Sequence, residues 1–199
     1  MTRRPRAPKS ALILGATGQT GRHLLRELIA SPTRVTPAEE LPAQASGKLE
    51  QKVIDFERLD EAGLKDGNWD AVFITLGTTI KLAGSQENFT KIDKEYVVNA
   101  AKAAKADKDQ RLVYISLGYK DTVVFRPALL ANVERPEGRL LESILVSLRS
   151  HVDKLAKSAR IAGELGTSGL PSSAMATQMN WGGRNFTSID NKGAVFLSR

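Results

Sequence analysis

The sequence contains no cysteine and only two histidines, His23 and His151. Without cysteine the chain can form neither a disulfide framework nor a thiolate metal site. Two histidines are also too few for a histidine-rich metal site. No apolar run reaches the ~18 residues that a helix needs to cross a bilayer. The sequence therefore predicts no metal site and no membrane-spanning helix.

The first ten residues, MTRRPRAPKS, lack acidic side chains. Their basic residues account for four of the formal net charge of +7, which leaves +3 on the remaining chain. No later run of Lys and Arg is interleaved with aromatic residues, which argues against nucleic-acid binding. The segment also lacks the apolar stretch of a secretory signal. We therefore expect residues 1–10 to form a basic tail on an intracellular protein, followed by a single domain over residues 11–199.

Apolar strands and amphipathic helices alternate from Ala11 onward. This alternation predicts an α/β fold with a Rossmann-like, doubly wound and mostly parallel sheet and helices on its faces. Glycine, serine, proline and asparagine dominate after Gly166 and predict irregular structure, so we expect a small helical and irregular C-terminal lobe from about residue 137. Strands are predicted at 11–14, 33–36 (a truncated second strand), 52–56, 70–76, 111–116 and 122–126, and helices at 21–30, 59–64, about 88 or 93 to 106, and 138–165.

The motif GATGQTG, residues 15–21, spaces three glycines between the first strand and the first helix. Gly15 permits a sharp exit from the strand, Gly18 lets backbone amides approach a pyrophosphate, and Gly21 lets the helix pack close to the strand. The helix N-terminus adds unpaired amides and positive partial charge. A structural turn is the alternative, but the strand before and the helix after favour a dinucleotide site. Further donors can come from Thr17, Gln19 and Thr20.

Several segments resemble the atypical short-chain dehydrogenase/reductase group. They are GATGQTG, KVIDF with its Asp55, AVFITLGTT, DKEYVVNAAKAAK and FRPALL, in the expected order. Within that group the chain is most similar to a fungal mitochondrial family related to the human Tat-interacting oxidoreductase. The resemblance covers most of the chain from residue 11.

The resemblance implies a nicotinamide dinucleotide cofactor whose pyrophosphate rests on the three glycines. It also implies that Asp55 faces the adenine amino group, where a carboxylate accepts an N–H. Plainer roles remain open, because Asp55 could cap a turn and Pro127 could simply end a strand. The other implied cofactor contacts are Leu76, Gly77 and Thr78, beside the riboses, and Pro127, which borders the nicotinamide with Arg126.

The choice between NAD and NADP depends on the end of the second strand, where a carboxylate binds ribose hydroxyls and an arginine binds a 2′-phosphate. The basic candidate is Arg34, and no acidic residue precedes Glu39 nearby. This favours NADP, with NAD as the alternative. The neighbourhood Ala30–Val35 is short compared with the family.

Catalytic short-chain dehydrogenases carry a Tyr-x-x-x-Lys pair between the fifth and sixth strands, on one face of a helix. This chain has no such pair. Only Leu117–Asp121 separates the two predicted strands, so the crossover helix is missing. Either the segment is absent from the protein, or the sequence is a truncated product of a longer enzyme. The residues four positions after Tyr96, Tyr114 and Tyr119 are Ala100, Gly118 and Val123.

The short connection has a structural consequence, because a parallel crossover needs about a dozen residues. Five residues suit a hairpin, so we predict that the fifth and sixth strands pair antiparallel or separate. Loss of the covering helix is further predicted to expose apolar sheet surface.

Three functions follow from these features. The chain could bind NADP or NAD with impaired or absent redox catalysis, which we favour. It could be an active NADP-dependent oxidoreductase on a small carbonyl or alcohol. It could also contact a membrane surface through its basic tail and the predicted helix that carries Arg149, Lys154, Lys157 and Arg160. The family resemblance implies a mitochondrial location, peripheral on the outer membrane.

Overall fold

The computed structural model describes residues 10–30, 34–37, 49–106, 110–113, 121–126, 130–131, 150–181 and 184–199. Its strands are β1 (Ser10–Leu14), β2 (Arg34–Pro37), β3 (Ala71–Ile74), β4 (Arg111–Val113), β5 (Asp121–Arg126), β6 (Leu130–Ala131), β7 (Ser150–His151), β8 (Thr177–Trp181) and β9 (Arg184–Asp190). Its helices are α1 (Gln19–Ala30), α2 (Ile80–Ala83), α3 (Gln86–Thr90), α4 (Val97–Ala104), α5 (Val152–Leu165) and α6 (Asn191–Leu197).

The main sheet has seven strands in the order β2-β1-β3-β4-β5-β9-β8. Six of them run parallel, and β8 pairs antiparallel with β9. This confirms the predicted Rossmann-like, mostly parallel fold. Because β2 and β3 lie on opposite sides of β1, the chain changes direction there. In open α/β sheets ligands bind outside the carboxyl ends of the strands at such a switch point.

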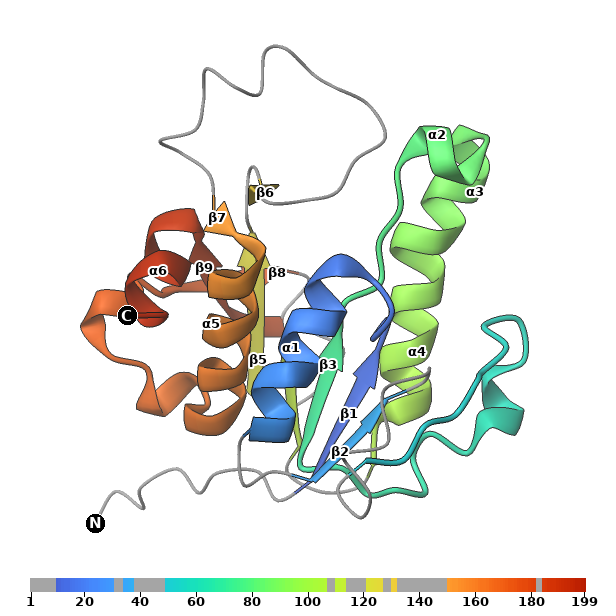
Figure 1. Ribbon diagram of the computed structural model, residues 1–199, viewed down its shortest axis with the longest axis horizontal. Coiled ribbons are helices and arrows are strands. Elements are labelled where there is room, and N and C mark those ends of the chain that lie inside the picture. The colour runs from blue at the N-terminus through green and yellow to red at the C-terminus, as the bar shows by residue number, and fades with distance from the viewer. Residues whose placement is uncertain are drawn as a thin grey trace.

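Helices cover the sheet on two faces (Figure 1). Alternate residues of β1 point to opposite faces, so that Ile13 packs under α1 and α5 while Leu12 and Leu14 pack on the side of α4. A strand buried on both faces needs a continuous apolar run, which SALIL supplies. Helix α1 contributes Leu24, Leu25 and Leu28, all fully buried.

The helix predicted to end near Ala106 is confirmed, with a feature that the sequence pattern did not indicate. It runs without interruption from α3 through a π-helical segment, Lys91–Tyr96, into α4. The π-helical segment separates two α-helical stretches by wider turns, and such segments often occur at functional sites. Val97, Ala100 and Ala104 then bury the apolar face of α4.

The strand predicted at 52–56 is wrong, because these residues form no strand. The segment still lies along the sheet, since Ile54 and Phe56 pack against the α4-side core while Val53 is 81% exposed. Lys52 donates from Nζ to the carbonyl oxygen of Ala62 at 2.6 Å. The alternating pattern of this segment therefore reflects burial of Ile54 and Phe56 on one side, without hydrogen bonding to a neighbouring strand.

The irregular structure predicted after Gly166 is also wrong, because β8, β9 and α6 form there and the two strands extend the main sheet. Polar side chains hold this part together: Thr167 donates its backbone amide to Asp121 at 2.9 Å, and Gln178 donates to Thr187 at 2.9 Å. The predicted helix over 138–165 is confirmed from Val152. Residues 150–151 form β7, and 138–149 lie outside the described residues.

The predicted antiparallel or separated arrangement of the fifth and sixth strands is wrong. β4 and β5 are parallel neighbours, with Leu112 opposite Thr122 and Val113 opposite Val123. β5 also pairs with β9 along its other edge, so both edges are satisfied. The predicted exposure of apolar sheet surface is wrong as well, since Leu112, Val113 and Val123 are buried. Burial on both faces favours the parallel arrangement despite the short connection, whose residues 114–120 lie outside the described part.

Gly163 tests how closely α5 packs on β3. A Cβ atom at this position would overlap the ring of Phe73, which is fully buried and cannot move aside easily. We expect Gly163→Ala to lower the free energy of unfolding by about 1–3 kcal/mol, the usual cost of overpacking a core. This outweighs the ~1 kcal/mol that alanine gains over glycine inside a helix. Urea denaturation measures the change.

The matched control is Gly77→Ala, because no heavy atom lies within 4 Å of a Cβ built there. It should leave the free energy of unfolding within about 0.5 kcal/mol of the parent. A Gly163→Ala protein as stable as this control would contradict the observed packing of α5.

Candidate functional site

The glycine loop, Gly15–Gly21, leaves β1 at the carboxyl edge of the sheet. Gly15 has φ +85°, a conformation that side-chain-bearing residues rarely adopt. A Cβ atom at Gly15 would lie 2.9 Å from the carbonyl carbon of Thr75. Thr75 fixes this contact, since its amide donates to Leu14 at 2.8 Å and its hydroxyl donates to the Gly15 carbonyl at 3.0 Å. The loop is therefore anchored against the end of β3.

The second half of the loop turns directly into α1. The Gly18 amide donates to the Gly15 carbonyl at 3.1 Å, and α1 begins at Gln19. A Cβ atom at Gly21 would overlap the Gly15 carbonyl oxygen, so only glycine allows this approach of helix and strand. Thr17 and Gly18 are exposed, whereas Gln19 and Thr20 are half-buried. The first amides of a helix have no intrahelical acceptor, so this exposed turn suits a phosphate group.

The post-β3 loop, Thr75–Thr79, lies next to the glycine loop. Leu76 packs against the α4-side core, and Gly77 is exposed with open space around it. The Thr78 amide donates to Oδ1 of Asp93 at 2.7 Å. The sequence predicted site roles for Leu76, Gly77 and Thr78. It gave no sign of Asp93, which lies fifteen residues after Thr78 in the π-helical segment.

A cavity of about 240 Å³ opens where the carboxyl ends of β3, β4 and β5 meet the glycine loop. Its walls are mostly apolar, and its mouth includes Thr20 of the loop. An apolar wall beside a turn that offers unpaired helix amides suits a flat ring attached to a phosphate chain. The residues that line it include Thr20, Thr75, Leu76, Val113, Phe125 and Leu155.

Asp55 begins a turn on the α4 side of the sheet. Its Oδ1 accepts the Glu57 amide at 2.9 Å, and its Oδ2 accepts Nε of Arg58 at 3.2 Å. The hydrogen bond from the Glu57 amide, and to a lesser extent the one from Arg58, lowers the pKa of Asp55 below its usual value. Asp55 therefore caps this turn, which is the plainer role considered from the sequence. Its carboxylate is half exposed, so lone pairs remain available to other donors.

Glu57 links the Asp55 turn to the π-helical segment. Its Oε1 accepts Nζ of Lys91 at 2.5 Å and the hydroxyl of Tyr96 at 2.5 Å. Lys91, followed by Tyr96, lowers the pKa of Glu57, and the same carboxylate raises the pKa of Tyr96. The ring of Tyr96 also stacks on Phe56, with centroids 5.4 Å apart. Tyr96 is therefore held as a protonated donor.

Arg34 and Pro127 are the remaining predicted site residues. Arg34 is the first residue of β2 and lies opposite Ser10, at the amino end of the strands. At ~3.3 Å per residue, this is roughly 10 Å from the carboxyl end of β2 at Pro37. The register therefore places the backbone of Arg34 at the end of β2 that lies away from the carboxyl edge of the sheet. Residues 38–48, which follow β2, and Pro127 lie outside the described residues.

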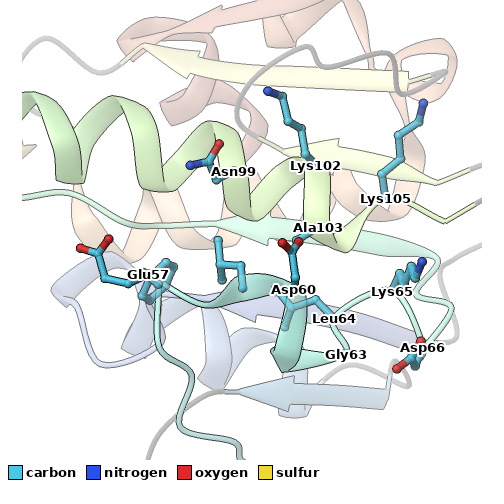
Figure 2. Close-up of a pocket in the computed structure, with 12 residues that line it drawn as sticks. Glu57, Asp60, Gly63, Leu64, Lys65, Asp66, Asn99, Lys102, Ala103 and Lys105 are labelled. Carbon is cyan, nitrogen blue, oxygen red and sulfur yellow. The ribbon is translucent and has the colours of Figure 1, made fainter.

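A second hollow, of about 670 Å³, lies between α4 and the segment 56–66 (Figure 2). Glu57 stands at one end, and Lys65, Lys102 and Lys105 lie toward the other. Lys102 and Lys105 lie at the C-terminal end of α4. The negative pole of the helix dipole stabilises positive charge there, so a structural role accounts for these two lysines. No residue of the glycine loop lines this hollow.

Of the basic residues on the helix predicted to contact a membrane, Arg160 is paired within the protein, whereas Lys154 is exposed. Arg160 of α5 donates to Glu27 at 3.1 Å and to Glu164 at 2.7 Å, so its charge is neutralised. Ala156 and Ala159 of α5 pack against α1 and the sheet. Within the described ranges, every helix is too short or too polar to cross a bilayer.

Comparisons with known proteins agree with this geometry. A family model described as NAD(P)H-binding matches residues 15–148. Protein HTATIP2 of Rattus norvegicus is 32% identical, with 66% of each chain covered, so this chain spans just under two thirds of that relative. Protein FMP52-1, mitochondrial, of Scheffersomyces stipitis is 29% identical over 72% of this chain and 76% of the relative. A short-chain dehydrogenase/reductase from Serratia marcescens has the same fold, with a TM-score of 0.62 at 13% identity, covering 96% of this chain and 99% of that one.

The length of the match supports an internal shortening. The alignment with the rat protein extends over 162 positions, yet it spans 66% of this 199-residue chain, or about 131 residues. The difference, 162 minus about 131, leaves about 31 positions of the alignment at which this chain has a gap. With the glycine loop, the sheet order and the family match together, the chain belongs to the NAD(P)H-binding family as an atypical short-chain dehydrogenase/reductase related to HTATIP2.

Proposed function

We propose that this protein binds NADP or NAD across the carboxyl edge of its sheet, without the Tyr/Lys proton transfer of catalytic short-chain dehydrogenases. The observation that carries the proposal is the glycine loop at the switch point. Gly15 lets the loop lie against the backbone of Thr75, and Gly21 lets α1 lie against the Gly15 carbonyl, where any side chain would collide. The pyrophosphate rests on the amides around Thr17–Thr20. The bound group supplies a nicotinamide ring that can accept or donate hydride.

The residues around the loop fit the two ends of such a molecule. The adenosine half extends toward Asp55 and the post-β3 loop, where Asp55 offers acceptor lone pairs to the adenine amino group. The nicotinamide half extends toward the apolar cavity near Phe125, with Pro127 as a further border. We include Leu76, Gly77 and Thr78 as ribose contacts on the same grounds.

The preference for NADP over NAD loses its basis when Arg34 lies at the amino end of β2. Either cofactor fits the described residues, because the pyrophosphate contacts are common to both.

Impaired catalysis is supported by the surroundings of Tyr96, the tyrosine among the described residues. Proton transfer requires a phenol whose pKa is lowered toward the working pH by a neighbouring cation. Tyr96 has the opposite environment, since the Glu57 carboxylate raises its pKa. Only seven residues, 114–120, separate β4 from β5. Such a connection is too short for the usual crossover helix.

Titration with NADPH and with NADH, followed by the fluorescence of the reduced nicotinamide, tests the proposal. We expect saturable binding of at least one, and no turnover with a panel of small carbonyl compounds. Gly18→Ala should weaken binding roughly tenfold or more, because the methyl group keeps phosphate oxygens from the amides and each such bond contributes about 1.5–3 kcal/mol.

Lys105→Ala is the matched control, since it removes a positive charge from the hollow in Figure 2 without touching the glycine loop. It should bind as the parent does. Turnover of any carbonyl in the panel would restore the alternative of an active oxidoreductase. Absence of binding, or a loss of affinity in Lys105→Ala that exceeds the loss in Gly18→Ala, would overturn the proposed site.

The environment of Tyr96 gives a separate pH prediction. The ultraviolet absorbance of the phenolate, compared between the parent and Tyr96→Phe, should show Tyr96 ionising above its ordinary value of 10.0. A raised pKa means that the Tyr96–Glu57 bond contributes its full stabilisation below pH ~10 and loses it as the pH rises through the pKa of Tyr96. Ionisation at or below the ordinary value would contradict the proposed role as a donor.

The location of the protein belongs to the same proposal. Because the name of the Scheffersomyces stipitis relative includes the word mitochondrial, we propose a mitochondrial location for this chain. Any peripheral contact with the outer membrane would have to involve a surface other than Arg160. Subcellular fractionation should recover the protein with mitochondria, and recovery entirely in the cytosolic supernatant would contradict this.

A further inference from the structure

We propose that the π-helical segment Lys91–Tyr96 positions both loops that flank the adenosine half of the cofactor, through contacts with Thr78 on one side and Glu57 on the other. This inference rests on the proposed cofactor site and adds positioning residues to it. Neither Asp93 nor Glu57 was singled out by the sequence pattern.

The first contact fixes the post-β3 loop. Both Asp93 and Thr78 are half-buried, and the 2.7 Å bond joins a carboxylate to a backbone amide. Hydrogen bonds to an ionised acceptor are shorter and stronger than neutral ones. Gly77 has no neighbour within 4 Å of a Cβ position, so packing does not hold this part of the loop. The Asp93 bond therefore determines where the loop lies between Leu76 and Thr79.

The second contact fixes the Asp55 turn. Lys91 and Tyr96 both bind Oε1 of Glu57, and Lys91 also lies 5.7 Å from the centre of the Tyr96 ring. Phe56, between Asp55 and Glu57, stacks on that ring with an interplanar angle of 23°. A displacement of the helix at Tyr96 would therefore displace the turn that presents Asp55.

The π-helical geometry explains why one carboxylate can accept from both residues. Lys91 and Tyr96 are five residues apart, which in an α-helix places them about 140° apart around the axis. In a π-helix the hydrogen bonds join residues five apart, so these two side chains come to the same face. Without the wider turns, Lys91 and Tyr96 would point in different directions and could not share Glu57.

The two loops meet the same core. Phe56 from the Asp55 turn and Leu76 from the post-β3 loop both pack against the cluster under α4. The post-β3 loop begins at Thr75, which binds the glycine loop directly. The π-helical segment thus holds the edges of a site whose floor is the glycine loop. Asp93 acts through Thr78, so it is a positioning residue and not a cofactor contact.

The experiment compares cofactor affinities of Asp93→Ala, Asp93→Asn and the matched control Glu95→Ala. Glu95 is exposed on the same segment, so its removal changes the charge equally while leaving the Thr78 contact intact. We expect Asp93→Ala to weaken NADPH or NADH binding roughly tenfold, because a charge-assisted hydrogen bond is lost. Asp93→Asn should recover part of the loss, since its amide oxygen still accepts from Thr78. Glu95→Ala should bind as the parent does.

ADP distinguishes positioning from a general loss of stability. It carries only the adenosine half, so Asp93→Ala should weaken ADP and the dinucleotide by the same factor. Nicotinamide mononucleotide carries the other half and should lose less affinity than ADP. Hydrogen exchange at the Thr78 amide supplies a readout independent of any ligand, and it should be faster in Asp93→Ala and in Asp93→Asn than in the parent.

The outcomes separate this inference from the proposed function. If the parent binds and Gly18→Ala binds more weakly, an Asp93→Ala protein with parental affinity for ADP overturns the positioning role and leaves the cofactor site intact. Unchanged Thr78 exchange in both Asp93 variants overturns it as well. If the parent binds neither NADPH, NADH nor ADP, the proposed function itself fails.

Discussion

The close approach of the glycine loop to the end of β3 is the constraint on which the rest of the structure depends. Gly15 adopts a positive φ beside the backbone of Thr75, and the Thr75 hydroxyl holds its carbonyl. Gly21 then lets α1 begin within contact of the same carbonyl. These contacts aim the first amides of α1 at the carboxyl edge of the sheet, where an anion can reach them. The family match explains what that anion is, and the geometry explains why glycine is required.

The parallel pairing of β4 and β5 shows that the sheet keeps its topology despite a short connection. Pairing with β3 and β9 on the outer edges and burial of Leu112 and Val123 hold the strands in register. The carboxyl edge that carries the glycine loop is therefore preserved, although only seven residues, 114–120, connect β4 to β5.

The parts predicted from the sequence are those that local signals determine. β1, the glycine loop and α1 form one continuous stretch, and their apolar periods and glycine spacing suffice. The prediction of a strand at 52–56 is wrong because alternating apolar and polar residues indicate only that one side of a segment is packed. Ile54 packs against the core in this way without a partner strand. β8 and β9 were missed because their polar side chains bond one another, as Gln178 and Thr187 do. Asp93 was missed because an α-helical period gives no sign of the π-helical turns that aim the segment.

The most direct test of the central claim is the response of individual backbone amides to the cofactor. In proton–nitrogen NMR spectra recorded with and without NADPH, or with NADH where that binds more tightly, the largest shifts should fall on the amides of Thr17, Gly18 and Thr20. Residues of the hollow in Figure 2, such as Lys65, should shift less. Unchanged glycine-loop amides together with saturating shifts elsewhere would contradict the account.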